Sequence, residues 1–272
     1  MNDLALQAQI DAASVYEELF VPAEFQEWAP RMIAAAQIQP GHRVLDVACG
    51  TGVLAREAAS RVGSTGSVTG LDPDAGMLAV AARLSSAIRW RRGTAESLPF
   101  ADRSFDSVVS QFGLMFFTDR PGALREMLRV LVPGGRMAVA VWDSLENTPA
   151  YADLVGLLDR VAGQRAADAL RAPFALGDRN ALKELFDSAG APEVTITTHT
   201  GAAQFPSIRS MVEAELRGWL PLTGIVLRDE QSLQILNEAE HILHPYVARE
   251  GQVRFASPAH IVTAAKTGKS HR

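Results

Sequence analysis

One segment near the N-terminus, residues 44–52, constrains the fold more than any other part of the sequence. It reads Val-Leu-Asp-Val-Ala-Cys-Gly-Thr-Gly, an apolar strand that carries an acidic residue and runs into a glycine-rich turn, and a helical pattern follows at once. Glycine lets the backbone turn sharply and lets a ligand approach the main chain. Such a strand–turn–helix unit is typical of α/β folds that bind nucleotide-containing cofactors. The segment therefore predicts an α/β fold with a cofactor pocket at this turn.

Short apolar runs alternate with helical patterns along the first half of the chain. This alternation is typical of a mostly parallel sheet with helices on both faces. The predicted strands are 43–47, 67–71, 88–91, 106–110 and 136–142, and the predicted helices are 53–62, 75–87 and 122–131.

The regular alternation of strands and helices changes after residue 142. Two more strands are predicted at 194–199 and 258–266, and helices at 151–161 and 178–189. Between the last two strands, residues 206–251 carry helical patterns only, which we interpret as a helical lid inserted over one edge of the sheet. The predicted organisation is an N-terminal helical cap at 1–40, a cofactor-binding core at 41–142, and the rest of the same fold at 143–272.

Composition narrows the class of protein. With 272 residues, 47% of them hydrophobic, the chain can bury a sizeable core. The net charge of −5 leaves no basic excess for a nucleic acid, and no apolar run reaches membrane-spanning length. Cys49 is the single cysteine, so neither an internal disulfide nor a cysteine-based metal site is expected. These features predict a cytoplasmic protein with a small-molecule substrate and no metal.

Two acidic residues indicate which cofactor the turn would bind. The run Gly50–Ala55 fits the dinucleotide pattern G-x-G-x-x-G/A, and Asp72, twenty residues after Gly52, ends the second predicted strand, where a carboxylate can hold a ribose. Asp46 puts a negative charge at the turn, which would repel a pyrophosphate and attract a cation. S-adenosylmethionine (SAM) has a ribose, an ammonium and a sulfonium but no phosphate. SAM is therefore favoured, and an NAD(P)-dependent oxidoreductase stays as an alternative.

Four segments in order, 44–52, 70–78, 93–100 and 128–136, together resemble class I SAM-dependent methyltransferases. The resemblance is to the branch related to the ubiquinone and menaquinone C-methyltransferases. It implies a Rossmann-like seven-stranded sheet, mostly parallel with the last strand antiparallel. It also implies methyl transfer from SAM to a small-molecule acceptor, with S-adenosylhomocysteine as the product.

The resemblance implies cofactor contacts at the ends of the first four strands. Asp46 would meet the amino group of SAM, Asp72 would hold the ribose, and Ala95 would donate its backbone N–H to the adenine. Thr94 departs from the family, which often has aspartate there, and Ala48 replaces a frequent glycine. The predicted cofactor residues are Asp46, Ala48, Gly50, Gly52, Asp72, Pro73, Met77, Thr94, Ala95, Glu96, Ser110 and Gln111.

The acceptor site is less defined by the sequence. Apolar residues in the lid favour an apolar or aromatic acceptor, and each candidate contact is weighed against plain core packing. No catalytic base is named, because SAM is an activated donor and transfer can proceed by proximity and orientation. A non-catalytic SAM-binding protein stays as a second alternative, and the chain is expected to be a monomer or homodimer. The predicted acceptor residues are Tyr16, Trp28, Phe112, Met115, Trp142 and Tyr151.

Overall fold

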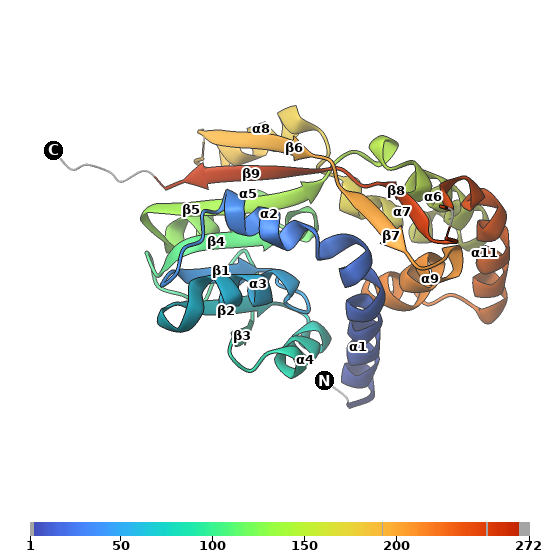
Figure 1. The fold of residues 1–272 in the computed structure, drawn as a ribbon, viewed down its shortest axis with the longest axis horizontal. Helices are drawn as coiled ribbons and strands as arrows, with labels where there is room; N and C mark the ends of the chain where they lie inside the picture. Colours follow the sequence, from blue (N-terminus) through green and yellow to red (C-terminus); the bar gives the residue numbers. More distant parts are fainter. Residues whose placement is uncertain (1–2, 192, 249, 267–272) are drawn as a thin grey trace.

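The centre of the computed structural model, which describes residues 3–191, 193–248 and 250–266, is a seven-stranded sheet (Figure 1). Its strand order is β3-β2-β1-β4-β5-β9-β6, and β9 runs antiparallel to both of its neighbours. The predicted Rossmann-like sheet, with an antiparallel last strand, is confirmed. The strands are β1 Arg43–Val47, β2 Ser67–Asp72, β3 Arg89–Arg92, β4 Phe105–Gln111, β5 Leu131–Trp142, β6 Val194–His199 and β9 Ala259–Ala265.

Helices cover the sheet with their apolar faces. In α3, Leu54, Ala55 and Ala58 are buried at helical spacing, and α2 and α3 lie in front of the sheet in Figure 1. Asp178 caps α8 by accepting hydrogen bonds from the N–H groups of the next turn. The helices outside the inserted region are α1 Asp3–Val15, α2 Trp28–Ala35, α3 Val53–Val62, α4 Ala75–Leu84, α5 Arg120–Val130, α6 Pro149–Ala162, α7 Gln164–Arg171 and α8 Arg179–Ser188.

Two boundaries differ by three residues or more from the sequence-based expectation, for identifiable reasons. Helix α4 ends at Leu84 instead of residue 87, because Ser85 is extended and its carbonyl accepts a 2.9 Å hydrogen bond from the Trp90 indole. Strand β5 begins at Leu131, before the predicted turn. In place of a turn between elements, the strand has a bulge around Gly134, whose φ of +80° favours glycine.

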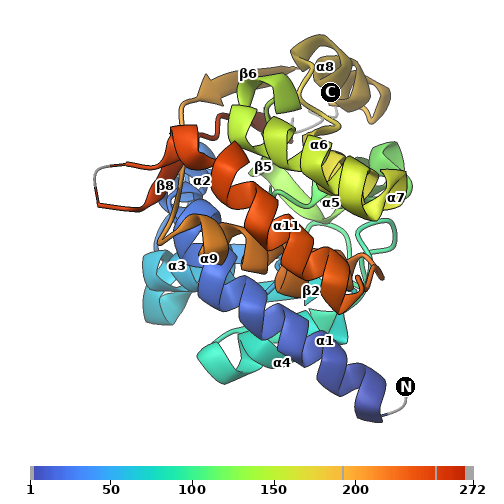
Figure 2. The same ribbon diagram turned by 90° about the vertical axis from the view of Figure 1, so that its right-hand side faces the viewer.

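The inserted region lies between β6 and β9. Strands β7 Ala202–Phe205 and β8 Val253–Ala256 pair antiparallel as a separate ribbon, and between them lie α9 Ile208–Glu213, α10 Leu220–Leu222 and α11 Asp229–Ile242. In Figures 1 and 2 this region, with α6 and α7, covers one end of the sheet. The helices agree with the expected lid, whereas the ribbon was not predicted. The division into cap, core and lid stays a prediction.

Two π-helical segments are the most unusual feature of the backbone. They span Tyr16–Phe25, the N-terminal π-helix, and Ala214–Trp219, the lid π-helix. Pro22 lies inside the first, and the N–H of Gln26 donates to the Val21 carbonyl five residues back at 2.8 Å. The wider turn brings side chains nine apart onto one face, so that the rings of Tyr16 and Phe25 stack at 5.1 Å. Because π-helical turns are rare and concentrate at functional sites, both segments mark a candidate site.

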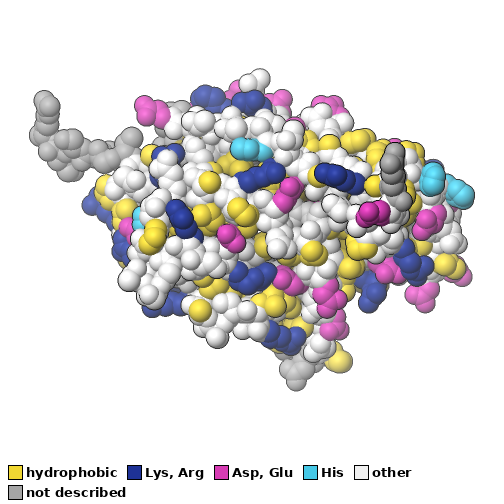
Figure 3. Space-filling view, viewed as in Figure 1, with side chains coloured by type: hydrophobic (Ala, Val, Ile, Leu, Met, Phe, Trp, Pro, Cys, Tyr) yellow, Lys and Arg dark blue, Asp and Glu magenta, His cyan; other side chains and the backbone are white. Residues whose placement is uncertain are grey.

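The surface mixes charges of both signs. On the face drawn in Figure 3, basic and acidic side chains are interspersed over the sheet and the inserted region. In the described part of the chain, no helix combines the length and the apolar character that crossing a membrane requires.

Candidate active site

A cavity of about 520 Å³ opens at the carboxyl ends of β1, β2 and β4, around the glycine turn, and we call it the turn cavity. Parallel α/β sheets bind ligands at this end of their strands. Among the predicted cofactor residues, Gly52 and Ser110 are not part of the lining that the described residues form. The predicted residues that do line the turn cavity are Asp46, Ala48, Gly50, Asp72, Pro73, Met77, Thr94, Ala95, Glu96 and Gln111.

Asp46 is the most deeply buried carboxyl group in the turn cavity. It is only 1% exposed, and neither carboxylate oxygen has a hydrogen-bond partner among the described residues. Burial, reinforced by the nearby Asp72 carboxylate, raises the pKa of Asp46 well above its usual value. A buried carboxylate without a partner is costly, so the site is built to receive a cation or a hydrogen-bond donor.

Asp72 ties the end of β2 to the glycine turn. Its Oδ2 accepts a hydrogen bond from the Gly50 N–H and its Oδ1 accepts one from the Asp74 N–H, both at 2.9 Å. Burial raises the pKa of Asp72 to about 6, although these two hydrogen bonds lower it. Each carboxylate oxygen keeps a second lone pair, so Asp72 can still accept from a ligand hydroxyl.

The glycines of the turn serve different purposes. Gly50 has a φ of +54°, and a Cβ built there would meet no atom of the described residues within 4 Å, which leaves this side open to a ligand. A Cβ on Gly52 would instead lie 2.4 Å from the Trp90 ring, so this glycine is required for packing. Ala48 takes a φ of +57°, which is uncommon for a residue with a side chain. Strain of this kind concentrates at functional sites.

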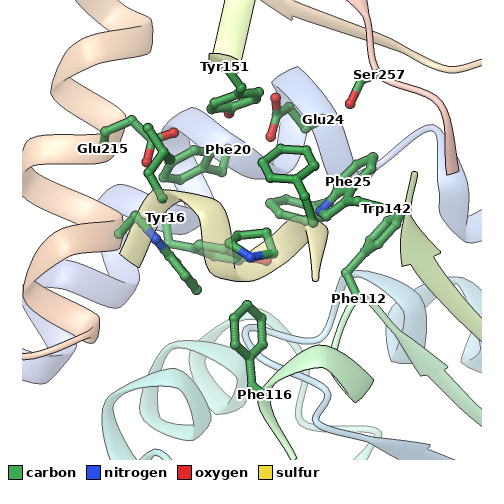
Figure 4. Close-up of a pocket in the computed structure, with 14 residues that line it drawn as sticks. Tyr16, Phe20, Glu24, Phe25, Phe112, Phe116, Trp142, Tyr151, Glu215 and Ser257 are labelled. Atoms are coloured by element: carbon green, nitrogen blue, oxygen red, sulfur yellow. The ribbon is translucent and has the colours of Figure 1, made fainter. Parts of the chain in front are cut away.

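A second, smaller cavity of about 70 Å³ adjoins the first, and we call it the aromatic cavity (Figure 4). Three of its polar side chains lie together: Tyr151 from α6 lies between Glu24 of the N-terminal π-helix and Glu215 of the lid π-helix. The remaining walls are mainly aromatic. The lining residues are Tyr16, Phe20, Glu24, Phe25, Phe112, Phe116, Trp142, Tyr151, Leu170, Pro173, Phe174, Glu215, Trp219 and Ser257.

The two cavities share one wall. Five aromatic residues line both: Tyr16, Phe25, Phe112, Phe116 and Trp219. The wall is fixed by ring packing, because Phe112 stacks face to face on Trp142 at 3.7 Å between ring centroids. A group held in one cavity therefore lies next to a group held in the other.

The structure separates the predicted acceptor residues into two groups. Tyr16, Phe112, Trp142 and Tyr151 line the aromatic cavity, whereas Trp28 and Met115 do not belong to its described lining. Trp28 is fully buried and packs edge-on against the rings of Phe112 and Trp142, so it supports the wall from behind.

Sequence reasoning missed both buried glutamates. Glu24 is 5% exposed and Glu215 is 2% exposed, although acidic side chains are almost never fully buried unless paired. The available signal was an acidic residue four positions from an aromatic one: Phe20 and Glu24 in one segment, Glu215 and Trp219 in the other. Four positions is also the spacing of side chains on one face of an ordinary α-helix, so this signal by itself does not mark a buried acid.

The histidines of the second half lie away from these cavities. None of His199, His241, His244 and His260 is among the described residues that line either cavity. His260 is buried, with Nε2 2.8 Å from the Gly177 carbonyl and Nδ1 2.9 Å from the Thr198 hydroxyl. Its ring nitrogens are already engaged in holding β9 against its neighbours.

Comparison with known proteins identifies the family. A methyltransferase domain model matches residues 45–139. A ubiquinone/menaquinone biosynthesis C-methyltransferase of Xanthomonas campestris is 45% identical over 118 residues, which is 41% of this chain and 47% of that protein. A demethylmenaquinone methyltransferase of Staphylococcus epidermidis is 34% identical over 188 residues, which is 64% of this chain and 78% of that protein. The chain belongs to the SAM-dependent methyltransferases, in the branch that is similar to the ubiquinone/menaquinone C-methyltransferases.

The predicted family and its cofactor, SAM, are thereby confirmed, and the nicotinamide alternative is not favoured. The chain spans only about half the length of two of these relatives: 47% of the Xanthomonas protein and 51% of a 2-phytyl-1,4-naphthoquinone methyltransferase of Thermosynechococcus vestitus. A methyltransferase structure from Anabaena variabilis superposes with a TM-score of 0.64 at 14% identity, over 88% of this chain and 96% of that one, and shares the fold.

The residues of the turn cavity fit SAM. The unpartnered Asp46 carboxylate suits the ammonium group, and the spare lone pairs of Asp72 suit the ribose hydroxyls. The open side of Gly50 leaves room for close approach to the backbone. Met77 and Ala95 add apolar surface to the lining, which suits the adenine ring.

Proposed function

We propose that this methyltransferase transfers the methyl group of SAM to a small aromatic acceptor of the quinol type. The observation that carries the proposal is the shared wall, since Tyr16, Phe25 and Phe112 border both the turn cavity and the aromatic cavity. The turn cavity fits the donor, and the adjoining aromatic cavity fits a flat apolar ring. Two of the relatives are methyltransferases of a naphthoquinone and of ubiquinone/menaquinone biosynthesis, which favours the same class of acceptor.

SAM, when bound, supplies a methyl group that is activated by its attachment to a sulfonium. The chain's own contribution is to hold the two reactants and exclude water. Asp46 would pair with the ammonium and Asp72 with the ribose, which fixes the donor in the turn cavity. The rings of Phe112 and Trp142 would hold the acceptor flat against the shared wall. Binding two reactants in one orientation supplies much of the rate enhancement that such a transfer needs.

Calorimetry tests the donor half of this proposal. We expect S-adenosylhomocysteine and SAM to bind the purified protein at micromolar concentrations, with no binding of NADH. Asp46→Asn should weaken both, whereas the control Asp187→Asn, on the exposed face of α8, should not. Tight binding of NADH alone would contradict the proposal.

Turnover tests the acceptor half. We expect methyl transfer from labelled SAM to reduced, hydroxylated single-ring and double-ring quinols. SAM binding without transfer to any of them would favour the non-catalytic alternative. A cytoplasmic location, a small molecule in preference to nucleic acid, and a monomeric or homodimeric state stay predictions of the sequence.

A further inference from the structure

Glu24, Glu215 and Tyr151 form a polar cluster at the aromatic cavity that methyl donation by SAM does not require. Glu24 Oε1 and Glu215 Oε2 are buried without a hydrogen-bond partner among the described residues. Tyr151 is the neighbour of both carboxyl groups, and its single O–H can donate to only one of them at a time. One carboxyl group is therefore always short of a donor. A buried acceptor in this state calls for a donor from the ligand.

The charges around the two cavities are of one sign. Among the described residues that line them, none is lysine, arginine or histidine. The acidic members are Asp46, Asp72, Asp74 and Glu96 in the turn cavity, and Glu24 and Glu215 in the aromatic cavity. An acceptor that carries a phosphate or carboxylate would face these groups without a protein cation, which costs several kcal/mol in such a setting.

Resting on the proposed function, we propose that the aromatic cavity binds a neutral, single-ring phenol or hydroquinone, and that Glu24 accepts the proton of its ring hydroxyl during methyl transfer. The size of the cavity supports one ring. At about 70 Å³ it is much smaller than the adjoining turn cavity of about 520 Å³, which favours a single ring over a larger ring system.

The ring O–H bond breaks and its proton moves to the Glu24 carboxylate, which makes the ring more electron-rich. A ring carbon beside the oxygen forms the bond to the methyl group, the carbon–sulfur bond breaks, and its electron pair stays on sulfur. The methylated carbon then loses its hydrogen as a proton to Glu215, while the ring oxygen takes its proton back from Glu24. The sum is a methylated ring, a neutral thioether and one released proton.

The electrostatics of the cluster suit this role. Burial raises the pKa of Glu24 to about 8, the Tyr151 hydroxyl opposes the rise and Glu27 adds to it. Glu215 and Tyr151 also have pKa values well above their usual ones because both are buried beside acidic neighbours. A carboxyl group titrating near 8 is much closer to a phenol than an ordinary glutamate is, so proton transfer is easier. The activity should therefore rise with pH up to about 8.

The test uses the full chain loaded with S-adenosylhomocysteine or SAM. The neutral probe is methylhydroquinone, the anionic probe is 2,5-dihydroxybenzoate and the double-ring probe is 1,4-dihydroxynaphthalene. Binding to the S-adenosylhomocysteine complex is followed by quenching of tryptophan fluorescence, because Trp142 and Trp219 line the cavity. Transfer is followed with labelled SAM from pH 6 to pH 9.

We expect methylhydroquinone to bind about 100-fold more tightly than the anionic probe. Glu24→Gln should keep the affinity for S-adenosylhomocysteine, lower kcat by about 100-fold and remove the rise toward pH 8. Glu215→Gln should lower kcat less. The control Glu18→Gln, an exposed position on the same π-helix, should behave as the unchanged protein.

Each contrary outcome has a definite meaning. Equal binding of the anionic and neutral probes, tighter binding of the double-ring probe, or an unchanged kcat and pH profile in Glu24→Gln would overturn this inference and leave the proposed function standing. If the unchanged protein does not bind S-adenosylhomocysteine, the proposed function itself is overturned. Glutamine mimics the protonated glutamate, so a folding defect is not expected, and the cofactor titration verifies that the variant is folded.

Discussion

The two cavities of this methyltransferase are built in opposite ways. The turn cavity draws mostly on segments close together in the sequence, and its key carboxylates, Asp46 and Asp72, sit at the ends of neighbouring parallel strands. The aromatic cavity draws Glu24, Tyr151 and Glu215 from three distant helices. Both cavities keep buried carboxyl oxygens that have no partner in the described part of the chain. The difference shows that a strand-end site can be fixed by local sequence, whereas a site between helices depends on how distant parts pack.

The largest effect is expected from filling the turn cavity with a side chain. Gly50→Val should lower SAM affinity roughly 100-fold, because the added side chain enters space that has no protein atom within 4 Å and that the cofactor would use. Isothermal titration calorimetry measures the effect.

The matched control for this change is Gly190→Val, after α8. Gly190 also has a positive φ, +86°, and an equally open Cβ direction, so both variants suffer similar backbone strain. Equal loss of SAM affinity in the two variants would mean that strain, and not occupation of the cavity, is responsible.

Neutralising Asp46 should have a smaller and two-sided effect. Asp46→Asn removes the charge that faces the ammonium, and SAM affinity should fall by about 30-fold. The protein without ligand should become more stable by about 1 kcal/mol at pH 7, because an unpartnered buried carboxylate is removed.

The sign of this stability change follows from the pKa. The fold raises the pKa of Asp46 above its unfolded value, so the native state loses stability as the pH rises above that value. The gain from Asp46→Asn should thus be present at pH 7 and fade toward pH 4. Thermal unfolding at both pH values checks it, and a variant less stable than the unchanged protein at pH 7 would show that Asp46 has a partner.

The sequence predicted the sheet and the turn cavity because both follow from local patterns. Apolar strands, glycine turns and strand-end carboxylates recur in a fixed order, and ten predicted cofactor residues line the cavity in the structure. Gly52 was expected beside the cofactor for the same local reason. Its packing against Trp90 depends on the neighbouring strand β3, which a local pattern does not reveal.

The aromatic cavity could be predicted only in part. Four aromatic residues were predicted because they lie near strand ends or in the cap, and all four line the cavity: Tyr16, Phe112, Trp142 and Tyr151. Glu24 and Glu215 were not predicted, because their burial depends on two π-helical segments that helical periodicity does not anticipate. The β7–β8 ribbon was missed for a related reason, since its strands have four residues each and about fifty residues separate them.

The smallest expected effect concerns Asp72. Its carboxylate accepts hydrogen bonds from backbone N–H groups, whereas that of Asp46 has no partner among the described residues. Burial raises the pKa of Asp72 to about 6, so it is ionised at pH 7.5 and largely protonated at pH 5. Only the ionised form accepts strongly from both ribose hydroxyls, so its protonation should weaken S-adenosylhomocysteine binding about tenfold between these pH values. Calorimetry in an Asp46→Asn background isolates this contribution, because the other raised carboxyl group of the turn cavity is then absent. Adding Asp72→Asn should flatten the pH profile. A profile that keeps its slope in the double variant would assign the titration to another group and remove Asp72 from the ribose site.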